Sequence, residues 1–244
     1  MVRRFGRGRF NDGPGLARKV VGWSTLRKRG KPIEDSRVQD PEQNAQMESL
    51  DHRAYVGGLW EEIGRLQFEF LLRQGLAPSD CFLDIACGSL RGGVHFINYL
   101  NPGNYLGIEK QRRLVELGIE KELGRAVFLK QKPEFIFSGD FEFHRFSKIP
   151  SYSIAQSLLT HLIPADIHVC LRNLRAFVKD GHVAFATFFE GDSSCNSEES
   201  HPHACFHYSV EEMDAFGRRV GWKPIYIGDW NHPRNQMMMR FEAT

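Results

Sequence analysis

Two short apolar segments end in acidic residues, and their spacing indicates nucleoside chemistry. The segment 82–88 carries Asp84 and closes in a turn of small residues. The segment 105–109 ends in Glu109, twenty-five residues after Asp84. In a βαβ unit, such a turn lets a ligand approach the backbone, and the second acid accepts hydrogen bonds from two ribose hydroxyls. We therefore predict a cofactor that contains adenosine. The candidate residues on these segments are Asp84, Ala86, Cys87, Gly88 and Glu109.

The glycine pattern of the turn argues against a dinucleotide. A pyrophosphate needs G-x-G-x-x-G, because it packs against an open helix N-terminus. Read from Ala86, the three positions hold Ala86, Gly88 and Arg91; read from Gly88, they hold Gly88, Leu90 and Gly93. Neither frame supplies three glycines, which disfavours an NAD-dependent reductase. S-adenosyl-L-methionine has no phosphate, so one tight turn, one acid for the ribose and one acid or amide near the adenine suffice.

Further motifs extend this pattern along the chain. They are LDIACGSLRGG (83–93), GIEK (107–110), AQSLLTHL (155–162), ATFFEG (186–191) and GDWNHPRNQMM (228–238). From about His52 onwards the chain resembles the class I S-adenosylmethionine-dependent methyltransferases, and most of all a bacterial group that reads LDIGCGSLRGG, AQSLFTHL, ATFFE and GDW.HPRGQ. Ala86 and Asn235 stand where that group has glycine, and the extra methyl of Ala86 is expected to weaken cofactor binding without abolishing it.

The resemblance implies roles for acids and amides at the strand ends. Asp84 is expected near the methionine ammonium, with a cap on the turn amides as the alternative. Asp140 matches the position that binds the adenine amine, and Phe141 would lend a backbone amide or a stacking face; the alternative is an acid in a surface turn. Gln156 ends the strand that faces the transferred methyl in this fold.

Arg91 and three histidines complete the candidate residues. Arg91 either pairs with the methionine carboxylate or is an exposed arginine at a helix start. A hydroxyl acceptor needs a general base, and histidine is the usual base near neutral pH. We rank His161 first because it follows the fourth strand, His232 second and His207 third. A hydrogen-bonded structural histidine is the competing interpretation for each of them.

The cysteines indicate reduced thiols and no metal. There are five, an odd number, and none forms a C-x-x-C pair, which favours the cytoplasm over a disulfide framework. The segment 195–207 holds two cysteines and three histidines, but its spacing matches no standard zinc site. We interpret it as a loop that covers the substrate. No apolar run has the length of a membrane helix, and no secretory signal is visible.

Charge and composition divide the chain into two parts. Residues 1–31 hold ten Lys or Arg and one acid, a charge of +9 in a chain whose total is +2. We predict a basic flexible extension and linker over residues 1–50 and a methyltransferase domain over residues 51–244. The extension is interpreted as solvated, with weak contact to an anionic membrane surface or to nucleic acid as the open alternatives.

Alternating segments predict the scaffold that positions these residues. We expect an α/β, Rossmann-like, doubly wound sheet of seven strands, mainly parallel, with one antiparallel strand near the C-terminus. Ser209 and Glu212 form a capping-box signal for the last helix. The predicted strands are 81–85, 105–109, 135–137, 152–156, 182–189, 225–227 and 237–241. The other predicted helices are 53–74, 91–100, 111–124 and 165–178.

These observations predict an S-adenosylmethionine-dependent methyltransferase. The expected acceptor is the hydroxyl of a sugar, glycan precursor or other small molecule, and the sugar preference comes from the resemblance alone. Two alternatives stay open. The basic extension could serve a nucleic-acid methyltransferase, whose binding would weaken steeply with salt. The chain could also bind the cofactor without catalysis, given Ala86 and the absence of an obvious base.

Overall fold

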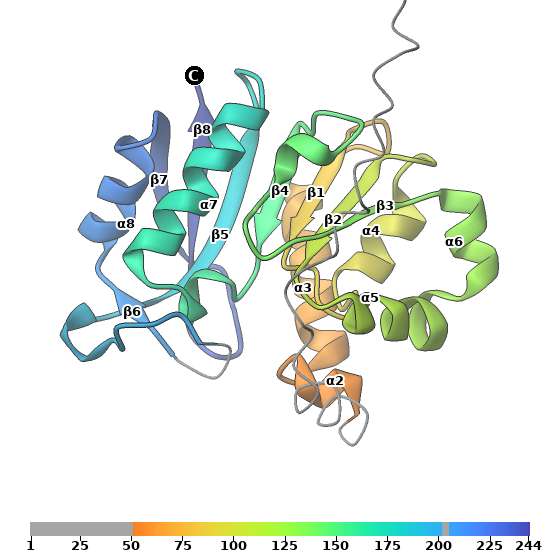
Figure 1. The fold of residues 1–244 in the computed structure, drawn as a ribbon, viewed down its shortest axis with the longest axis horizontal. Coiled ribbons are helices and arrows are strands. Elements are labelled where there is room, and N and C mark those ends of the chain that lie inside the picture. The colour runs from red at the N-terminus through yellow and green to blue at the C-terminus, as the bar shows by residue number, and fades with distance from the viewer. Residues whose placement is uncertain (1–50, 202–204) are drawn as a thin grey trace, which may run out of the picture. The chain divides into compact units, whose positions relative to one another are not determined.

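The described part of the chain forms one mixed sheet covered by helices. The computed structural model describes residues 51–201 and 205–244. There the main sheet runs in the order β3-β2-β1-β4-β5-β8-β7, and β6 pairs with β5 (Figure 1). No helix among these residues is long and apolar enough to cross a membrane. The extension predicted for residues 1–50 lies outside the described residues, so it stays a prediction.

The predicted sheet is confirmed, with one strand added. The strands are β1 (Phe82–Ile85), β2 (Tyr105–Glu109), β3 (Glu134–Phe137), β4 (Tyr152–Ala155), β5 (Val183–Glu190), β6 (His207–Tyr208), β7 (Trp222–Asp229) and β8 (Gln236–Ala243). β8 is antiparallel to both β5 and β7, whereas the other pairings are parallel. The expected seven strands become eight because β6 pairs with the end of β5, and two residues are too few to show an alternating pattern.

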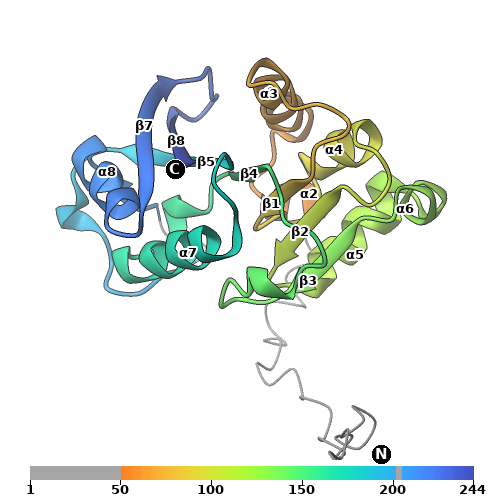
Figure 2. The ribbon, with the colours of Figure 1, turned by 90° about the horizontal axis from the view of Figure 1, so that it is seen from above.

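Helices cover both faces of the sheet (Figure 2). They are α2 (His52–Tyr55), α3 (Trp60–Arg73), α4 (Gly93–Tyr99), α5 (Arg112–Gly118), α6 (Arg125–Gln131), α7 (Pro164–Phe177) and α8 (Val210–Arg218). One apolar core packs α7 and α8 on the sheet, and a second packs α3, α4 and α5. Ile167, Leu171 and Leu174 of α7 are buried against the sheet, and the predicted capping box that opens α8 is present.

The helix predicted over residues 53–74 is two helices. Gly57, Gly58 and Leu59 have φ angles of 92°, 64° and 47°, in the left-handed region. Glycine adopts that region readily, whereas a helix interior cannot contain it. The chain therefore breaks between α2 and α3, and the segment between them is free to approach the turn after β1.

The helix predicted over residues 111–124 is also interrupted. α5 ends at Gly118 and passes into a π-helix, Ile119–Leu123, which is followed by α6. A Cβ at position 118 would lie 2.3 Å from the carbonyl oxygen of Ser89, so only glycine fits there. The end of α5 thus packs directly on the turn after β1, and a π-helix beside such a turn is typical of functional regions.

Candidate functional site

The turn after β1 is tight because alternate residues are left-handed. Ala86, Gly88 and Leu90 have φ angles of 58°, 55° and 69°. Gly88 adopts this conformation without cost, whereas a side chain with a Cβ is strained there. Ala86 thus adopts a backbone conformation that glycine would adopt without strain. Glycine is the residue expected at this position from the motif LDIGCGSLRGG. A Cβ at Gly88 would lie 3.2 Å from Val56, so the segment after α2 lies against this turn.

Glu109 fastens the turn to the end of β2. Its side chain is buried, and its two carboxylate oxygens accept hydrogen bonds from the backbone amides of Gly88 and Gln111, each at 3.0 Å. Burial raises the pKa of Glu109, while those two amides act to lower it. The parallel register of β1 and β2 places this carboxylate beside the turn, as the spacing predicts. Its role toward a ribose stays a prediction.

Asp84 is a buried acid held by one tyrosine. Tyr105 Oη donates to Asp84 Oδ2 at 2.8 Å. Burial raises the pKa of Asp84 to about 7, the Tyr105 hydrogen bond acts to lower it, and the nearby Glu109 raises it further. Burial also raises the pKa of the Cys87 thiol well above its ordinary value, so this thiol is neutral. Two buried acids and no thiolate therefore surround the turn.

Arg91 is buried, so its interpretation as an exposed helix-start residue is wrong. Its side chain is 8% exposed. One terminal nitrogen donates to the carbonyls of Val56 and Gly58 at 3.1 and 2.9 Å, and the other donates to Gln156 Oε1 at 2.7 Å. Burial and the nearby Arg234 lower the pKa of Arg91 to about 10. Arg91 thus ties the segment after α2 to the end of β4.

Gln156 continues this contact into a buried polar network. Its amide nitrogen donates to Ser157 Oγ at 2.7 Å and lies 3.2 Å from His232 Nε2. Gln236 Oε1 accepts from the hydroxyls of Thr187 and Ser157 at 2.8 and 3.0 Å. The network joins the carboxyl ends of β4 and β5 to the start of β8, because β8 is antiparallel to β5.

His232 belongs to this network and is almost fully buried. Its Nδ1 accepts from the backbone amide of Arg234 at 3.2 Å, and its ring stacks on Trp230 at 5.3 Å between centroids. Burial and the cations of Arg91 and Arg234 lower its pKa to about 4. A ring held in this way is neutral at physiological pH. Its catalytic role stays a prediction.

His161 lies just beyond β4. It ends a 3₁₀ turn, Leu159–His161, and its backbone carbonyl accepts from the amide of His201 at 3.2 Å. Its side chain is half-buried, whereas that of His232 is buried. The position after β4 is the one that the ranking used, and the role as a base stays a prediction.

Asp140 and Phe141 follow β3 in a constrained turn. Asn173 Nδ2 lies 3.3 Å from the carbonyl oxygens of both residues and donates to them. Phe141 has a φ of 55°, and its ring stacks with Phe143 at 6.1 Å between centroids. The Asp140 side chain is exposed. Asn173 on α7 was not a candidate from the sequence, and the adenine roles of both turn residues stay predictions.

Two contacts near Glu109 were missed by sequence reasoning. The guanidinium of Arg112 lies over the ring of Phe137, 4.0 Å from its centroid, at the carboxyl ends of β2 and β3. Gln111 Nε2 donates to Tyr55 Oη at 3.2 Å. Neither pair can be recognised from the sequence, because each joins residues that are far apart in the chain. Both border the position expected for a nucleoside beside Glu109.

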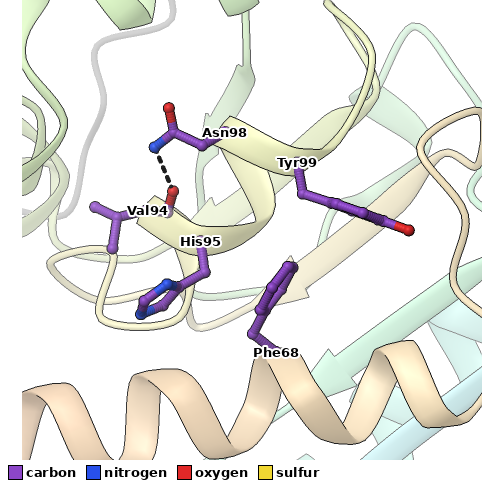
Figure 3. A pocket seen from close by; sticks show the side chains of 5 residues that line it. All are labelled: Phe68, Val94, His95, Asn98 and Tyr99. Atoms are coloured by element: carbon purple, nitrogen blue, oxygen red, sulfur yellow. Dashed lines mark hydrogen bonds between the residues drawn. The ribbon is translucent and has the colours of Figure 1, made fainter.

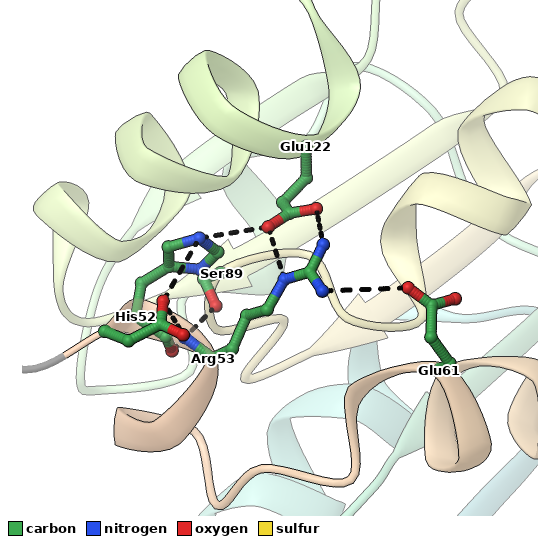
Figure 4. Close-up of polar contacts among 6 residues, drawn as sticks. His52, Arg53, Glu61, Ser89 and Glu122 are labelled. Carbon is green, nitrogen blue, oxygen red and sulfur yellow. Dashed lines mark hydrogen bonds and ion pairs between the residues drawn. The ribbon is translucent and has the colours of Figure 1, made fainter.

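A charged cluster holds α2 beside the turn (Figure 4). Arg53 binds Glu122 of the π-helix through two hydrogen bonds, both 2.7 Å, and His52 Nε2 lies 3.0 Å from the same carboxylate. Arg53 also lies over the Trp60 ring at 5.0 Å. The Ser89 hydroxyl lies 3.4 Å from the His52 carbonyl and donates to it. The π-helix therefore fixes α2 against the β1 turn.

A cavity of about 460 Å³ lies between α3 and α4, away from these residues (Figure 3). Its lining residues are Phe68, Val94, His95, Asn98 and Tyr99. None of the candidate site residues lines it, so its size does not make it the candidate site. Within residues 51–201 and 205–244, no group of three or more His, Cys, Asp or Glu side chains is placed to hold a metal ion.

Solved methyltransferase structures share this fold. The magnesium protoporphyrin IX methyltransferase from Synechocystis PCC 6803, with bound S-adenosylhomocysteine, is 9% identical with a TM-score of 0.54, over 76% of this chain and 86% of that one. The CcbJ methyltransferase from Streptomyces caelestis is 12% identical with a TM-score of 0.59, over 78% and 98%. An O-methyltransferase family protein from Burkholderia thailandensis is 9% identical with a TM-score of 0.59, over 83% and 62%. No protein-family model matches the chain. At these identities the likeness is one of fold.

Proposed function

We propose that this protein is an S-adenosyl-L-methionine-dependent methyltransferase that acts on a hydroxyl of a small molecule or glycan precursor. One observation carries the proposal. On a sheet with the methyltransferase strand order, a buried Glu109 at the end of β2 lies 3.0 Å from the amide of a left-handed Gly88 at the end of β1. In doubly wound sheets, ligands bind outside the carboxyl ends of the strands, where this pair lies.

The charged groups around the turn fit this cofactor. S-adenosyl-L-methionine carries a diol, an ammonium and a carboxylate. Glu109 is a buried acceptor for the diol, and Asp84 is a buried acid for the ammonium. Arg91 is a buried cation whose hydrogen bonds all go to uncharged oxygens, and Asp84 acts on it without a hydrogen bond between the two side chains. Arg91 would take the carboxylate of the cofactor, because buried charges are usually paired and an anionic ligand group would supply a direct ion pair.

In this proposal the protein positions the acceptor beside the cofactor and accepts the proton that the acceptor loses. The cofactor, when bound, supplies an electrophilic methyl on a sulfonium. Methyl transfer then needs an acceptor oxygen aligned with that methyl and sheltered from water. Gln156 and its network fix the end of β4, where the acceptor would lie. His161 would take the proton that the acceptor hydroxyl loses when it is methylated.

Two observations bear on the class of the methyl acceptor. The solved structures that share the fold include an enzyme described as an O-methyltransferase family protein and another described as a glycopeptide N-methyltransferase. The motifs of the chain resemble a bacterial group that is associated with glycan assembly, which favours a sugar hydroxyl. We therefore place O-methylation of a sugar or glycan precursor first.

Ligand binding tests the proposal directly. Calorimetric titration should show that S-adenosylhomocysteine binds the full chain and that NAD and NADP do not. Glu109→Ala should bind S-adenosylhomocysteine more weakly than the unchanged chain. A cooperative thermal melt should show that this variant is still folded. Binding of NAD in preference to S-adenosylhomocysteine, or binding of none of the three, would overturn the proposal.

A further inference from the structure

Two guanidinium groups meet at the segment between α2 and α3. Arg91 donates to the carbonyls of Val56 and Gly58, and Arg234 donates to the carbonyl of Gly57, which lies between them. A Cβ at Gly57 would lie 2.9 Å from Arg234 Nη1, so the guanidinium sits directly on the glycine backbone. Arg91 reaches this segment from the β1 turn, and Arg234 reaches it from the connection between β7 and β8.

These two cations lack acidic partners. Within the described ranges, no carboxylate oxygen lies within 4.0 Å of either guanidinium, although Arg53, Arg113, Arg145, Arg175, Arg218 and Arg240 all form ion pairs. The two like charges are close enough to repel, and Arg234 contributes to the lowered pKa of Arg91. A pair of neighbouring cations whose hydrogen-bond acceptors are backbone carbonyls and the Gln156 amide is a site of positive potential that an anion would relieve.

The cofactor accounts for only one of the two charges. S-adenosyl-L-methionine has a single carboxylate, and the proposed function assigns it to Arg91, which is buried beside the β1 turn. Arg234 is exposed and follows His232 by two residues. Its backbone amide donates to the His232 ring, which contacts the end of β4 through Gln156. Arg234 therefore lies at the outer side of the same strand ends, toward the place where an acceptor would bind.

We propose that Arg234 is a specificity-determining residue that binds an anionic group, a carboxylate or phosphate, of the methyl acceptor. This inference rests on the proposed function and narrows its substrate class to anionic acceptors. A planar guanidinium binds a carboxylate or phosphate through two parallel hydrogen bonds, which orients the acceptor as well as holding it. Its other contact, with the Gly57 carbonyl, fixes the guanidinium in advance.

The experiment uses inorganic phosphate as the probe and the full chain saturated with S-adenosylhomocysteine. Phosphate binding is measured by calorimetry and by NMR of the arginine side chains. Arg234→Gln should weaken phosphate binding at least tenfold, which is the usual loss when a hydrogen bond to a charged group is removed. Its affinity for S-adenosylhomocysteine should stay within about twofold of the unchanged chain. Arg219→Gln removes an exposed arginine at the end of α8 and should change neither affinity.

Each other outcome overturns the inference in a distinct way. If Arg234→Gln weakens S-adenosylhomocysteine and leaves phosphate binding unchanged, Arg234 serves the cofactor's carboxylate instead. If phosphate binds only the empty chain and competes with S-adenosylhomocysteine, the anion site belongs to the cofactor. If the saturated chain binds no phosphate, Arg234 is not an anion site. If S-adenosylhomocysteine itself does not bind, the proposed function fails, and this inference falls with it.

A conservative variant guards against misfolding. Arg234→Lys keeps the charge and loses the two-pronged geometry, so it should retain part of the phosphate affinity. If Arg234→Gln unfolds while Arg234→Lys melts normally, the comparison of phosphate affinity between Arg234→Lys and the unchanged chain decides the question. An equal affinity in those two proteins would contradict the proposed bidentate contact.

Discussion

The carboxylate of Glu109 and the backbone amide of Gly88 lie 3.0 Å apart as acceptor and donor. The same carboxylate accepts from the amide of Gln111, so it holds the β1 turn and the residues after β2 together. Its role toward a ribose is tested by substitution.

We expect Glu109→Ala to weaken S-adenosylhomocysteine binding by about 1–3 kcal/mol, the range for losing hydrogen bonds to a charged group. Isothermal calorimetry measures the change. Glu120→Ala, an exposed acid on the neighbouring π-helix, should bind normally. An unchanged affinity in a folded Glu109→Ala protein would remove Glu109 from the site.

We expect Ala86→Gly to stabilise the protein by about 1 kcal/mol, because Ala86 has a φ of 58° and glycine relieves that strain. Chemical denaturation measures the free energy of unfolding. Asn235→Gly, at a φ of 54°, should gain less, since asparagine tolerates the left-handed region. A loss of stability in Ala86→Gly would show that the methyl group contributes packing that outweighs the strain.

We expect S-adenosylhomocysteine affinity to rise with pH up to about 7 and then to level. Burial raises the pKa of Asp84 to about 7, so the empty site holds a proton below that pH. An ammonium binds the ionised carboxylate, so binding releases the proton, and affinity increases by at most tenfold per pH unit. Asp84→Asn should bind weakly and show no such slope. A pH-independent affinity in the unchanged chain would contradict contact between Asp84 and the ammonium.

Asp84 should also make the free energy of unfolding fall as the pH rises, whereas a salt-bridged acid makes it rise. Because the folded carboxyl holds its proton more tightly than the unfolded one, its contribution is greatest below pH 4 and is lost as the pH rises to 7. The melting temperature of Asp84→Asn should therefore rise relative to that of the unchanged protein as the pH increases from 5 to 8. A constant difference across this range would mean that the carboxyl is already ionised at pH 5.

We expect His161→Ala to lower turnover by roughly 10²–10⁴-fold and to leave S-adenosylhomocysteine affinity intact, if His161 is the general base. His232→Ala should instead lower the melting temperature along with the rate, because His232 is buried in a polar network. His168→Ala on α7 is the control for a half-buried histidine. Full activity of His161→Ala on an anionic acceptor would reject this assignment.

We expect Glu122→Gln to lower both the melting temperature and the affinity for S-adenosylhomocysteine. The substitution removes the charge that binds Arg53 and leaves buried His52 with a weaker partner, so α2 would detach from the β1 turn. Thermal melts with and without ligand measure both effects. Glu120→Gln should change neither, and equal behaviour of the two variants would show that α2 does not shape the site.

The sheet could be predicted well because its signals are local. The strands around Asp84 and Glu109 are short apolar runs, and the four residues of β1 pair in parallel with the first four residues of β2. The break between α2 and α3 was missed because apolar residues at helical spacing (59, 63, 66 and 70) follow directly on the glycines at 57–58. The end of α5 at Gly118 was missed because only the structure shows how closely that position approaches Ser89. The left-handed conformation of the glycines at 57–58 becomes evident only from their φ angles.

The site could be predicted in part. Glu109, Asp84 and Arg91 were candidates because each stands beside a recognisable turn, and the structure places all three there, while their roles toward a cofactor stay predictions. Arg234 and Glu122 were missed because their partners are far away in the sequence: Gly57 for Arg234 and Arg53 for Glu122. Side-chain contacts with carbonyls of an irregular segment leave no pattern in a sequence. Burial similarly decides the pKa of Asp84 and His232, and no motif encodes it.

The contact between Arg234 and Gly57 spans 177 positions of the chain. Contacts of such separation close late in folding, because the long loop between them must lose its entropy first. The βαβ unit around Asp84 and Glu109 involves neighbouring segments and can form early. A growing polypeptide would thus have the β1 turn before Arg234 could reach Gly57. A ligand that contacts both the β1 turn and Arg234 would bind only chains with a finished β7–β8 hairpin, and so would stabilise the mature fold selectively.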